Sequence, residues 1–143
     1  MSRNPVVCLI APPNPAMVLP QIAPPLGLLY LAGWARAHGF DTSDWRVIDL
    51  NTECLGPWPA SGHWTHDFTV ERCLSLIPTG ADVYGLSLAS MQLPHGRALA
   101  RVLRAREPGA LIVAGGSHAS ALPDECCDPV AMREGHFYVV VER

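Results

Sequence analysis

The stretch Leu111–Pro123, LIVAGGSHASALP, decides the fold of this 143-residue chain. It begins as an apolar run typical of a buried strand, and it breaks at Gly115-Gly116. The small and polar residues from Ser117 to Ser120 are suited to open a helix. A buried strand that turns into a helix through two glycines is how a doubly wound α/β fold presents its backbone to a ligand. Taken alone, the pattern is equally consistent with a plain turn.

Outward from this stretch, short apolar runs alternate with segments of helical periodicity. The predicted strands are Pro5–Ala11, Trp45–Leu50, Asp82–Leu88, Ala110–Ala114 and Phe137–Val141. The predicted helices run from Pro24-Pro25 to a stop at His38-Gly39, over Val70–Ile77, over Gln92–Arg106, and over a short proline-interrupted segment, Ser120–Cys127. This order predicts an α/β, flavodoxin-like (Rossmann-like) fold, a doubly wound five-stranded parallel sheet of order 2-1-3-4-5.

Helical spacing also predicts which faces are buried. In the first helix the apolar residues at helical spacing, expected to face the sheet, are Leu26, Leu29, Tyr30, Gly33 and Ala37. In the helix over 92–106 the residues expected to face inward are Leu99, Val102 and Leu103, and those expected on a solvated face are Arg97, Arg101 and Arg104.

Composition excludes several classes of function. The net charge of −3 and the pI of about 6.0 give no basic surface for nucleic acid. No apolar run reaches the roughly 18 residues of a membrane span. The five cysteines are odd in number and lack CxxC spacing, so Cys8 and Cys73 are expected to fill the core as free thiols. Free thiols indicate a reducing, cytoplasmic compartment, and no iron–sulfur motif is present.

The loops that follow the strands lack the signatures of the common α/β ligands. The loop over 12–25 holds six prolines and no glycine, so it matches neither a dinucleotide nor a flavin phosphate loop, and it is expected to form a rigid lip or cover. The chain has no lysine for a Walker A motif and no GxSxG nucleophile elbow. His63-x-x-His66 lacks partners at metal-ligand spacing, so neither a metal site nor a catalytic residue is predicted, and no role is assigned to the loop over 52–68.

The predicted topology brings the segments 12–25, 49–52, 87–92 and 115–120 to the carboxyl edge of the sheet, where α/β folds bind ligands. These segments carry prolines, small residues and short polar groups, with few charges. Such a wall suits a bulky, mostly uncharged ligand better than a polyphosphate.

Four blocks of sequence, in order, resemble the N-terminal cobalamin (B12)-binding domain of B12-dependent radical SAM enzymes. They cover nearly the whole chain: 23–32 (APPLGLLYLA), 47–51 (VIDLN), 82–87 (DVYGLS) and 113–123 (VAGGSHASALP). The end of the chain, 137–142, resembles the strand that leads toward the radical SAM domain of that family. Three segments depart from the family pattern: 39–49, the proline-rich lip over 12–25, and the Trp/His loop over 52–68.

The resemblance implies base-off binding of cobalamin, with the dimethylbenzimidazole tail between the sheet edge and its helices. The Asp-x-His-x-x-Gly motif that supplies a histidine ligand to cobalt in other carriers is absent, so the implied mode is His-off. For His118 a loop-structuring or tail-contacting role is expected rather than cobalt ligation. The residues that would contact the cofactor are Pro13, Asn14, Pro25, Leu26, Gly27, Asp49, Asn51, Ser87, Leu88, Ser90, Gln92, Gly115, Gly116, Ser117, His118 and Ser120.

The implied parent is a methyltransferase in which a methyl group passes from S-adenosylmethionine, by way of cobalamin, to a substrate radical. S-adenosylmethionine and a [4Fe-4S] cluster would bind an absent domain, so this chain alone should be inactive. Residues 1–143 are expected to form a single domain, the N-terminal fragment of a longer protein. A flavodoxin-like sheet has a helix after its fifth strand, and without it the apolar face would need the radical SAM domain or another partner. The alternatives are a non-enzymatic module for a nucleotide-like ligand and a structural domain that binds nothing.

Overall fold

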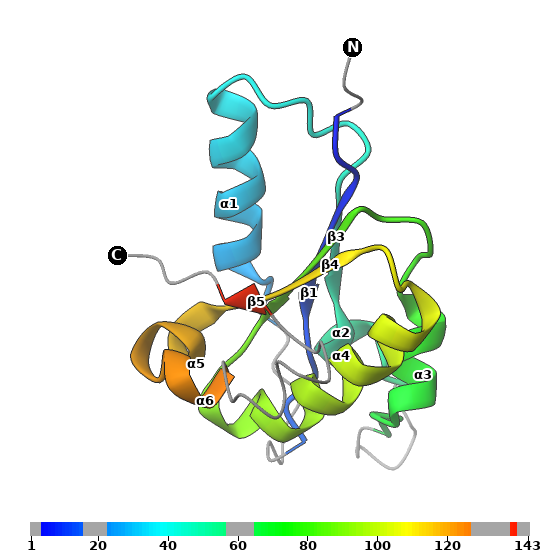
Figure 1. Ribbon diagram of the computed structural model, residues 1–143. Coiled ribbons are helices and arrows are strands. Elements are labelled where there is room, and N and C mark those ends of the chain that lie inside the picture. The colour runs from blue at the N-terminus through cyan, green and yellow to red at the C-terminus, as the bar shows by residue number, and fades with distance from the viewer. Residues whose placement is uncertain (1–3, 16–22, 57–64, 127–137, 140–143) are drawn as a thin grey trace.

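The computed structural model describes residues 4–15, 23–56, 65–126 and 138–139 (Figure 1). Its centre is a parallel sheet of order β2-β1-β3-β4-β5, as predicted. Four strands have four or five residues, and the fifth, at the edge, has two. Their bounds, within two residues of the predicted ends for the first four, are Val7–Ala11 (β1), Arg46–Asp49 (β2), Val83–Ser87 (β3), Leu111–Gly115 (β4) and Tyr138–Val139 (β5).

Side chains alternate between the two faces of the sheet. Cys8 and Ile10 of β1 point into the larger core, whereas Val7 and Leu9 point into the smaller one. The same alternation places Tyr84 and Leu86 of β3, and Ile112 and Ala114 of β4, in the larger core. Gly85 and Ser87 of β3, and Val113 and Gly115 of β4, therefore belong to the opposite face, which decides where the site forms.

Three helices cover much of the larger core, to which Ala119 and Cys126 also contribute, and α1 (Leu26–Ala37) lies on the other side of the sheet (Figure 1). The three are α2 (Leu50–Glu53), α3 (Val70–Leu76) and α4 (Leu93–Arg106), the last preceded by a 3-10 turn, η1 (Ser90–Gln92). Cys8 and Cys73 are fully buried there, as predicted. Leu99 and Leu103 of α4 are also buried, with Val102 packed against them.

The predicted inner face of α1 is wrong. Of the residues predicted to face the sheet, Leu26, Leu29 and Tyr30 are 58%, 45% and 76% exposed, while Leu28 and Ala35 are buried. The helix is apolar on both sides, so periodicity alone did not distinguish them. The outward face is a shallow apolar groove, hereafter the α1 groove, lined by Leu26, Leu29, Tyr30, Gly33 and Trp34.

Two short helices differ from the sequence prediction. Leu50 is not the last residue of a strand: it opens α2, where an irregular loop was expected, because the Asp49 side chain caps the turn by accepting from the Asn51 amide. The helix after β4 begins at Gly116 rather than Ser120, giving α5 (Gly116–Ala121) and, after a break at Leu122, α6 (Pro123–Cys126). A proline at 123 disfavours helical backbone at the preceding residue.

The predicted solvated arginine face of α4 is wrong for two of its three members. Arg104 Nη1 donates to the carbonyl oxygens of Pro108 and Ala110, at 3.2 and 2.6 Å. Arg97 Nη2 donates to the carbonyl oxygen of Glu125, which ties α6 to α4. Main-chain carbonyls that end turns and helices need donors, and arginine supplies several from one side chain.

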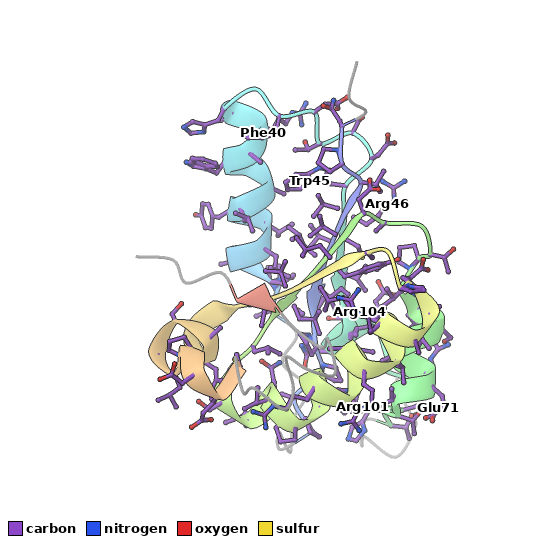
Figure 2. All side chains as sticks on the ribbon, in the orientation of Figure 1. Phe40, Trp45, Arg46, Glu71, Arg101 and Arg104 are labelled. Atoms are coloured by element: carbon purple, nitrogen blue, oxygen red, sulfur yellow. The ribbon has the colours of Figure 1, made fainter. Side chains whose placement is uncertain are left out.

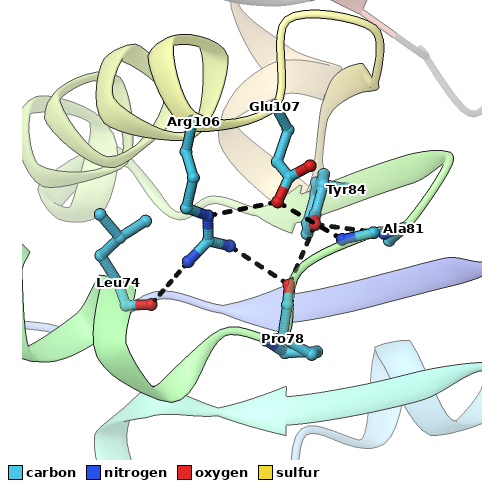
Figure 3. Close-up of polar contacts among 7 residues, drawn as sticks. Leu74, Pro78, Ala81, Tyr84, Arg106 and Glu107 are labelled. Carbon is cyan, nitrogen blue, oxygen red and sulfur yellow. Dashed lines mark hydrogen bonds and ion pairs between the residues drawn. The ribbon is translucent and has the colours of Figure 1, made fainter.

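A third arginine, Arg106, makes its contacts at the amino end of the sheet, away from the predicted ligand edge (Figure 3). Arg106 donates to the carbonyl oxygens of Leu74 and Pro78, at 2.9 and 3.2 Å, and its Nε lies 3.5 Å from Glu107 Oε1. The buried Tyr84 hydroxyl donates to Pro78 O at 3.0 Å and accepts from the Ala81 amide at 3.3 Å. These bonds fix the closed end of the fold and leave the carboxyl edge for binding.

Several sequence predictions fall on residues outside the described ranges. They are residues 16–22 of the proline-rich lip, residues 57–64 of the loop over 52–68, Cys127, and the ends of the strand predicted over 137–141. Among the described residues, no helix combines the length and the apolar character needed to cross a membrane.

Candidate functional site

One carbonyl oxygen joins the loops after three strands. Pro12 O, just beyond β1, accepts from Asn51 Nδ2 at 3.2 Å and from Gln92 Nε2 at 2.6 Å. Asn51 Oδ1 accepts from the Asn14 amide at 2.8 Å, and Gln92 Oε1 accepts from the Ala89 amide at 2.8 Å. The side-chain amides of both residues are therefore used to hold the edge together.

Asp49 is also engaged within the protein. Its Oδ1 accepts from the backbone and side-chain nitrogens of Asn51, each at 3.1 Å, and its Oδ2 accepts from Thr52 Oγ1 at 2.7 Å. A carboxylate so placed caps α2 and orients Asn51. The structure thus gives Asp49 a local structural task at the end of β2.

The loops after β3 and β4 are joined through their main chains. The Leu88 amide donates to Gly115 O at 2.8 Å, and the His118 amide donates to Leu88 O at 3.0 Å. Gly116 lies against this contact with a φ of +90°, where a side chain would be strained. The Gly-Gly pair is therefore both a turn and a close packing of two backbones.

A buried histidine links three elements of the same edge. The His118 side chain is 3% exposed, and its Nδ1 lies 3.0 Å from Ser90 Oγ in η1. Its Nε2 lies 3.3 Å from Glu125 Oε2 in α6, within ion-pair distance, but has no hydrogen-bond partner among the described residues. Ser90 itself is exposed. Both imidazole nitrogens thus face groups of this chain.

A pocket of about 400 Å³ lies between α1 and the sheet. It extends along the strands from Val7, Val83 and Trp45 to Ser87 and Gly115 at the carboxyl ends, and Trp45 lies between α1 and the sheet (Figure 2). Its volume is within the range of small-molecule sites, roughly 300–1,000 Å³. The residues that line it are Val7, Leu9, Gly27, Leu28, Leu31, Trp45, Val83, Gly85, Leu86, Ser87, Val113, Gly115 and Gly116.

Glycines keep this pocket open. A Cβ at Gly27 or Gly115 would meet no atom within 4 Å, so at these positions a side chain would project into free space. Gly85 lies in the middle of β3, where a Cβ would come within 3.1 Å of Leu9 Cδ2. Polar groups in the wall are sparse: the Ser87 hydroxyl, and the Trp45 Nε1, which is buried without a hydrogen-bond partner among the described residues. An apolar, flat ligand with few polar atoms matches such walls.

The residues that the sequence predicted to contact the ligand lie at several different places in the structure. Gly27, Ser87, Gly115 and Gly116 line the pocket, whereas Ser90, Ser117 and Ser120 are exposed and do not line it. Pro13, Leu88 and His118 have buried side chains, so they support the site from within. Asn14, Asp49, Asn51 and Gln92 make the bonds described above, Pro25 is half-buried before α1, and Leu26 lies in the α1 groove.

Sequence reasoning missed most of the apolar wall. Leu28 and Leu31 of α1 were not predicted to face the sheet, and Trp45 was read only as the start of a strand. The alternation within each strand was the available signal, since Val83, Gly85 and Ser87 fall on one face and Val113 and Gly115 on the same one. That signal does not reveal which face stays open.

Thiols and histidines elsewhere do not form a metal centre in the described residues, where no group of three or more metal-ligating side chains was found. Cys54 Sγ lies 3.7 Å from Cys73 Sγ, and His95 Nε2 lies 3.6 Å from the latter. Burial raises the pKa of Cys73 to about 12 and also raises that of Cys54, while it lowers the pKa of His95. His66 stacks on Phe68, with ring centroids 4.2 Å apart.

Comparison with known proteins gives one family. The family model described as the B12 binding domain matches residues 16–141. No curated protein and no solved structure matches this chain.

Proposed function

The chain belongs to the B12-binding domain family, and we propose that it binds cobalamin base-off and His-off, as the cofactor module of a B12-dependent radical SAM methyltransferase. The observation that carries the binding mode is the glycine-lined pocket between α1 and the sheet. When bound, cobalamin supplies a cobalt centre able to carry a methyl group.

The residues of the pocket fit the tail of this cofactor. Dimethylbenzimidazole is flat and apolar, and the walls of Leu9, Leu28 and Val113 offer it surface without charge. Free space over Gly27 and Gly115 lets the ring pass close to the backbone. The Ser87 hydroxyl is placed to serve as a polar contact at the carboxyl end of β3.

The His-off mode is supported by what the histidines of the edge do. Residues 12–25, which follow β1, contain no histidine. His118 is buried between Ser90 and Glu125, so neither ring nitrogen is free to approach cobalt. This supports the loop-structuring role expected for His118.

The exposed apolar face of α1 is proposed to contact a second domain. On the sheet, Leu111 is 40% exposed. The α1 groove leaves Tyr30 and Trp34 more than half exposed, and an apolar groove of this kind marks an interaction site. We assign it to the radical SAM domain of the same polypeptide, which would hold S-adenosylmethionine and the [4Fe-4S] cluster. The free thiols of Cys8, Cys54 and Cys73 support a reducing compartment such as the cytoplasm.

The test of binding uses the purified domain incubated with hydroxocobalamin and desalted. Retained corrin absorbance at one equivalent is expected, and a colourless protein would contradict the proposal. After reduction to the Co(II) form, the electron paramagnetic resonance spectrum should lack the splitting of an axial nitrogen. For the parent enzyme, a CxxxCxxC motif in the reading frame beyond Arg143 and methyl transfer from S-adenosylmethionine are expected.

A further inference from the structure

We propose that Glu125 and His118 hold the Ser90 hydroxyl as a hydrogen-bond acceptor at the carboxyl edge, where it recognises the carboxamide N–H groups on the rim of the corrin ring. This inference rests on the proposed function, because it names the part of cobalamin that Ser90 contacts. Ser90 would be a specificity-determining residue, and His118 and Glu125 would be positioning residues.

The tautomer of His118 follows from its two neighbours. Glu125 Oε2 lies 3.3 Å from Nε2, and a carboxylate beside a ring nitrogen favours the proton on that nitrogen. Nδ1 then carries a lone pair. Because Ser90 Oγ lies 3.0 Å from Nδ1, its O–H donates to the ring.

This arrangement decides what Ser90 can offer a ligand. A hydroxyl whose proton points into the protein presents only its oxygen lone pairs outward. Ser90 is exposed, whereas His118 behind it is 3% exposed. The Ser90 proton therefore points inward to His118, and the lone pairs of the Ser90 oxygen face outward. Carboxamide N–H groups match such an acceptor, and a carboxylate in the same place does not.

The chain of contacts from Glu125 through His118 to Ser90, called the relay below, is held in place by hydrogen bonds on both sides. Arg97 donates to the Glu125 carbonyl oxygen and so ties α6 to α4. The His118 amide donates to Leu88 O at 3.0 Å, and the Leu88 amide donates to Gly115 O at 2.8 Å, which fixes α5 against the loop that leads to Ser90. These bonds hold α5 and α6 in place behind the Ser90 hydroxyl.

The first experiment needs no cofactor. Nitrogen NMR of the ¹⁵N-histidine-labelled domain should show His118 with its proton on Nε2. In Glu125→Gln the glutamine can approach Nε2 as an acceptor or a donor, and we expect the Nε2–H population to fall. A wild-type protein with the proton on Nδ1 would overturn the relay.

The second experiment measures binding of hydroxocobalamin and of a cobalamin monocarboxylic acid, in which one rim carboxamide is hydrolysed, taking each positional isomer in turn. Ser90→Ala should weaken cobalamin binding roughly three- to tenfold, the range of one lost hydrogen bond. It should also lose the preference for the amide over one of the acids. His118→Asn, which can return an acceptor near the Nδ1 position, should restore more affinity than His118→Leu. Ser75→Ala, at an exposed position of α3, is the matched control and should bind as the wild type does.

Two failures are distinguishable. If the wild-type domain does not retain hydroxocobalamin, the proposed function falls and the role of Ser90 falls with it. If the wild type binds and Ser90→Ala binds equally well with the same preference, only the inference about Ser90 is overturned.

Discussion

Gly116 lies directly against the main chain of Leu88: a Cβ at residue 116 would come within 2.7 Å of the Leu88 nitrogen and 2.8 Å of its oxygen. The neighbouring Gly115 has the opposite surroundings, since a Cβ there would meet nothing within 4 Å. One glycine of the pair is needed by the fold and the other keeps the pocket open.

Gly116→Ala should lower the free energy of unfolding by about 2 kcal/mol or more, because the new Cβ adds a backbone clash to an unfavourable φ of +90°. Urea unfolding measures the change. Gly80→Ala is the control: Gly80 has a φ of +78° but no neighbour within 4 Å, so it should lose only about 1 kcal/mol. Equal losses in the two variants would contradict a role for the Leu88 contact.

Gly115→Val should leave the domain folded and block the pocket. The residue has extended backbone at the end of β4, which accommodates a β-branched side chain, and its Cβ points into free space. We expect at least tenfold weaker binding of cobalamin, with little change for cobinamide, which lacks the nucleotide tail. A parallel loss of both ligands would argue against the pocket as the tail site.

Asn51→Ala should lower the free energy of unfolding by about 1–2 kcal/mol, because the Asn14 amide loses its acceptor and Pro12 O loses one of two donors. Thr52→Ala removes an exposed bond to Asp49 instead and should change the free energy by less than about 0.5 kcal/mol. Chemical denaturation of both variants compares them. A smaller effect at Asn51 than at Thr52 would refute the bridging role of Pro12.

Side-chain truncation can test which face of α1 packs on the sheet. Leu28→Ala should lower the free energy of unfolding by about 2–3 kcal/mol, since Leu28 is 7% exposed and packs on the sheet. Leu29→Ala, at a residue that is 45% exposed, should lower it by less than about 1 kcal/mol. The reverse order would restore the face predicted from helical spacing.

The buried thiols predict loss of stability at high pH. Burial raises the pKa of Cys8 and of Cys73 from 9.0 to about 12, so the native state keeps protons that the unfolded state releases. The free energy of unfolding should therefore fall between pH 9 and 12, by up to about 1.4 kcal/mol per pH unit for each thiol. Unfolding titrations measure this slope, and Cys8→Ala should reduce it. A slope unchanged in that variant would contradict the assignment.

Much of the fold was predictable because buried parallel strands are written as short apolar runs. LIVA before Gly115 and PVVCLIA before Pro12 are such runs, and the strand order followed from the topology of doubly wound sheets. The face of α1 was not predictable, since Leu28 and Leu29 are equally apolar and only the position of the sheet distinguishes them. The helix α2 was not predicted from the sequence, because a four-residue helix is determined by one cap, Asp49, rather than by periodicity.

The α/β class, the strand order and the family could be read from the sequence, because these depend on local hydrophobic runs and on the order of motifs along the chain. The tasks of individual residues became clear only from the three-dimensional structure. Asn51, Gln92 and His118 are polar residues at strand ends, and sequence cannot tell whether such groups face a ligand or one another. The packed edge answers this: Asn51 and Gln92 share Pro12 O, and His118 is buried behind Ser90. The pocket arises from three-dimensional packing, since Gly27 of α1 and Gly115 of β4, far apart in the chain, both leave free space where a side chain would project.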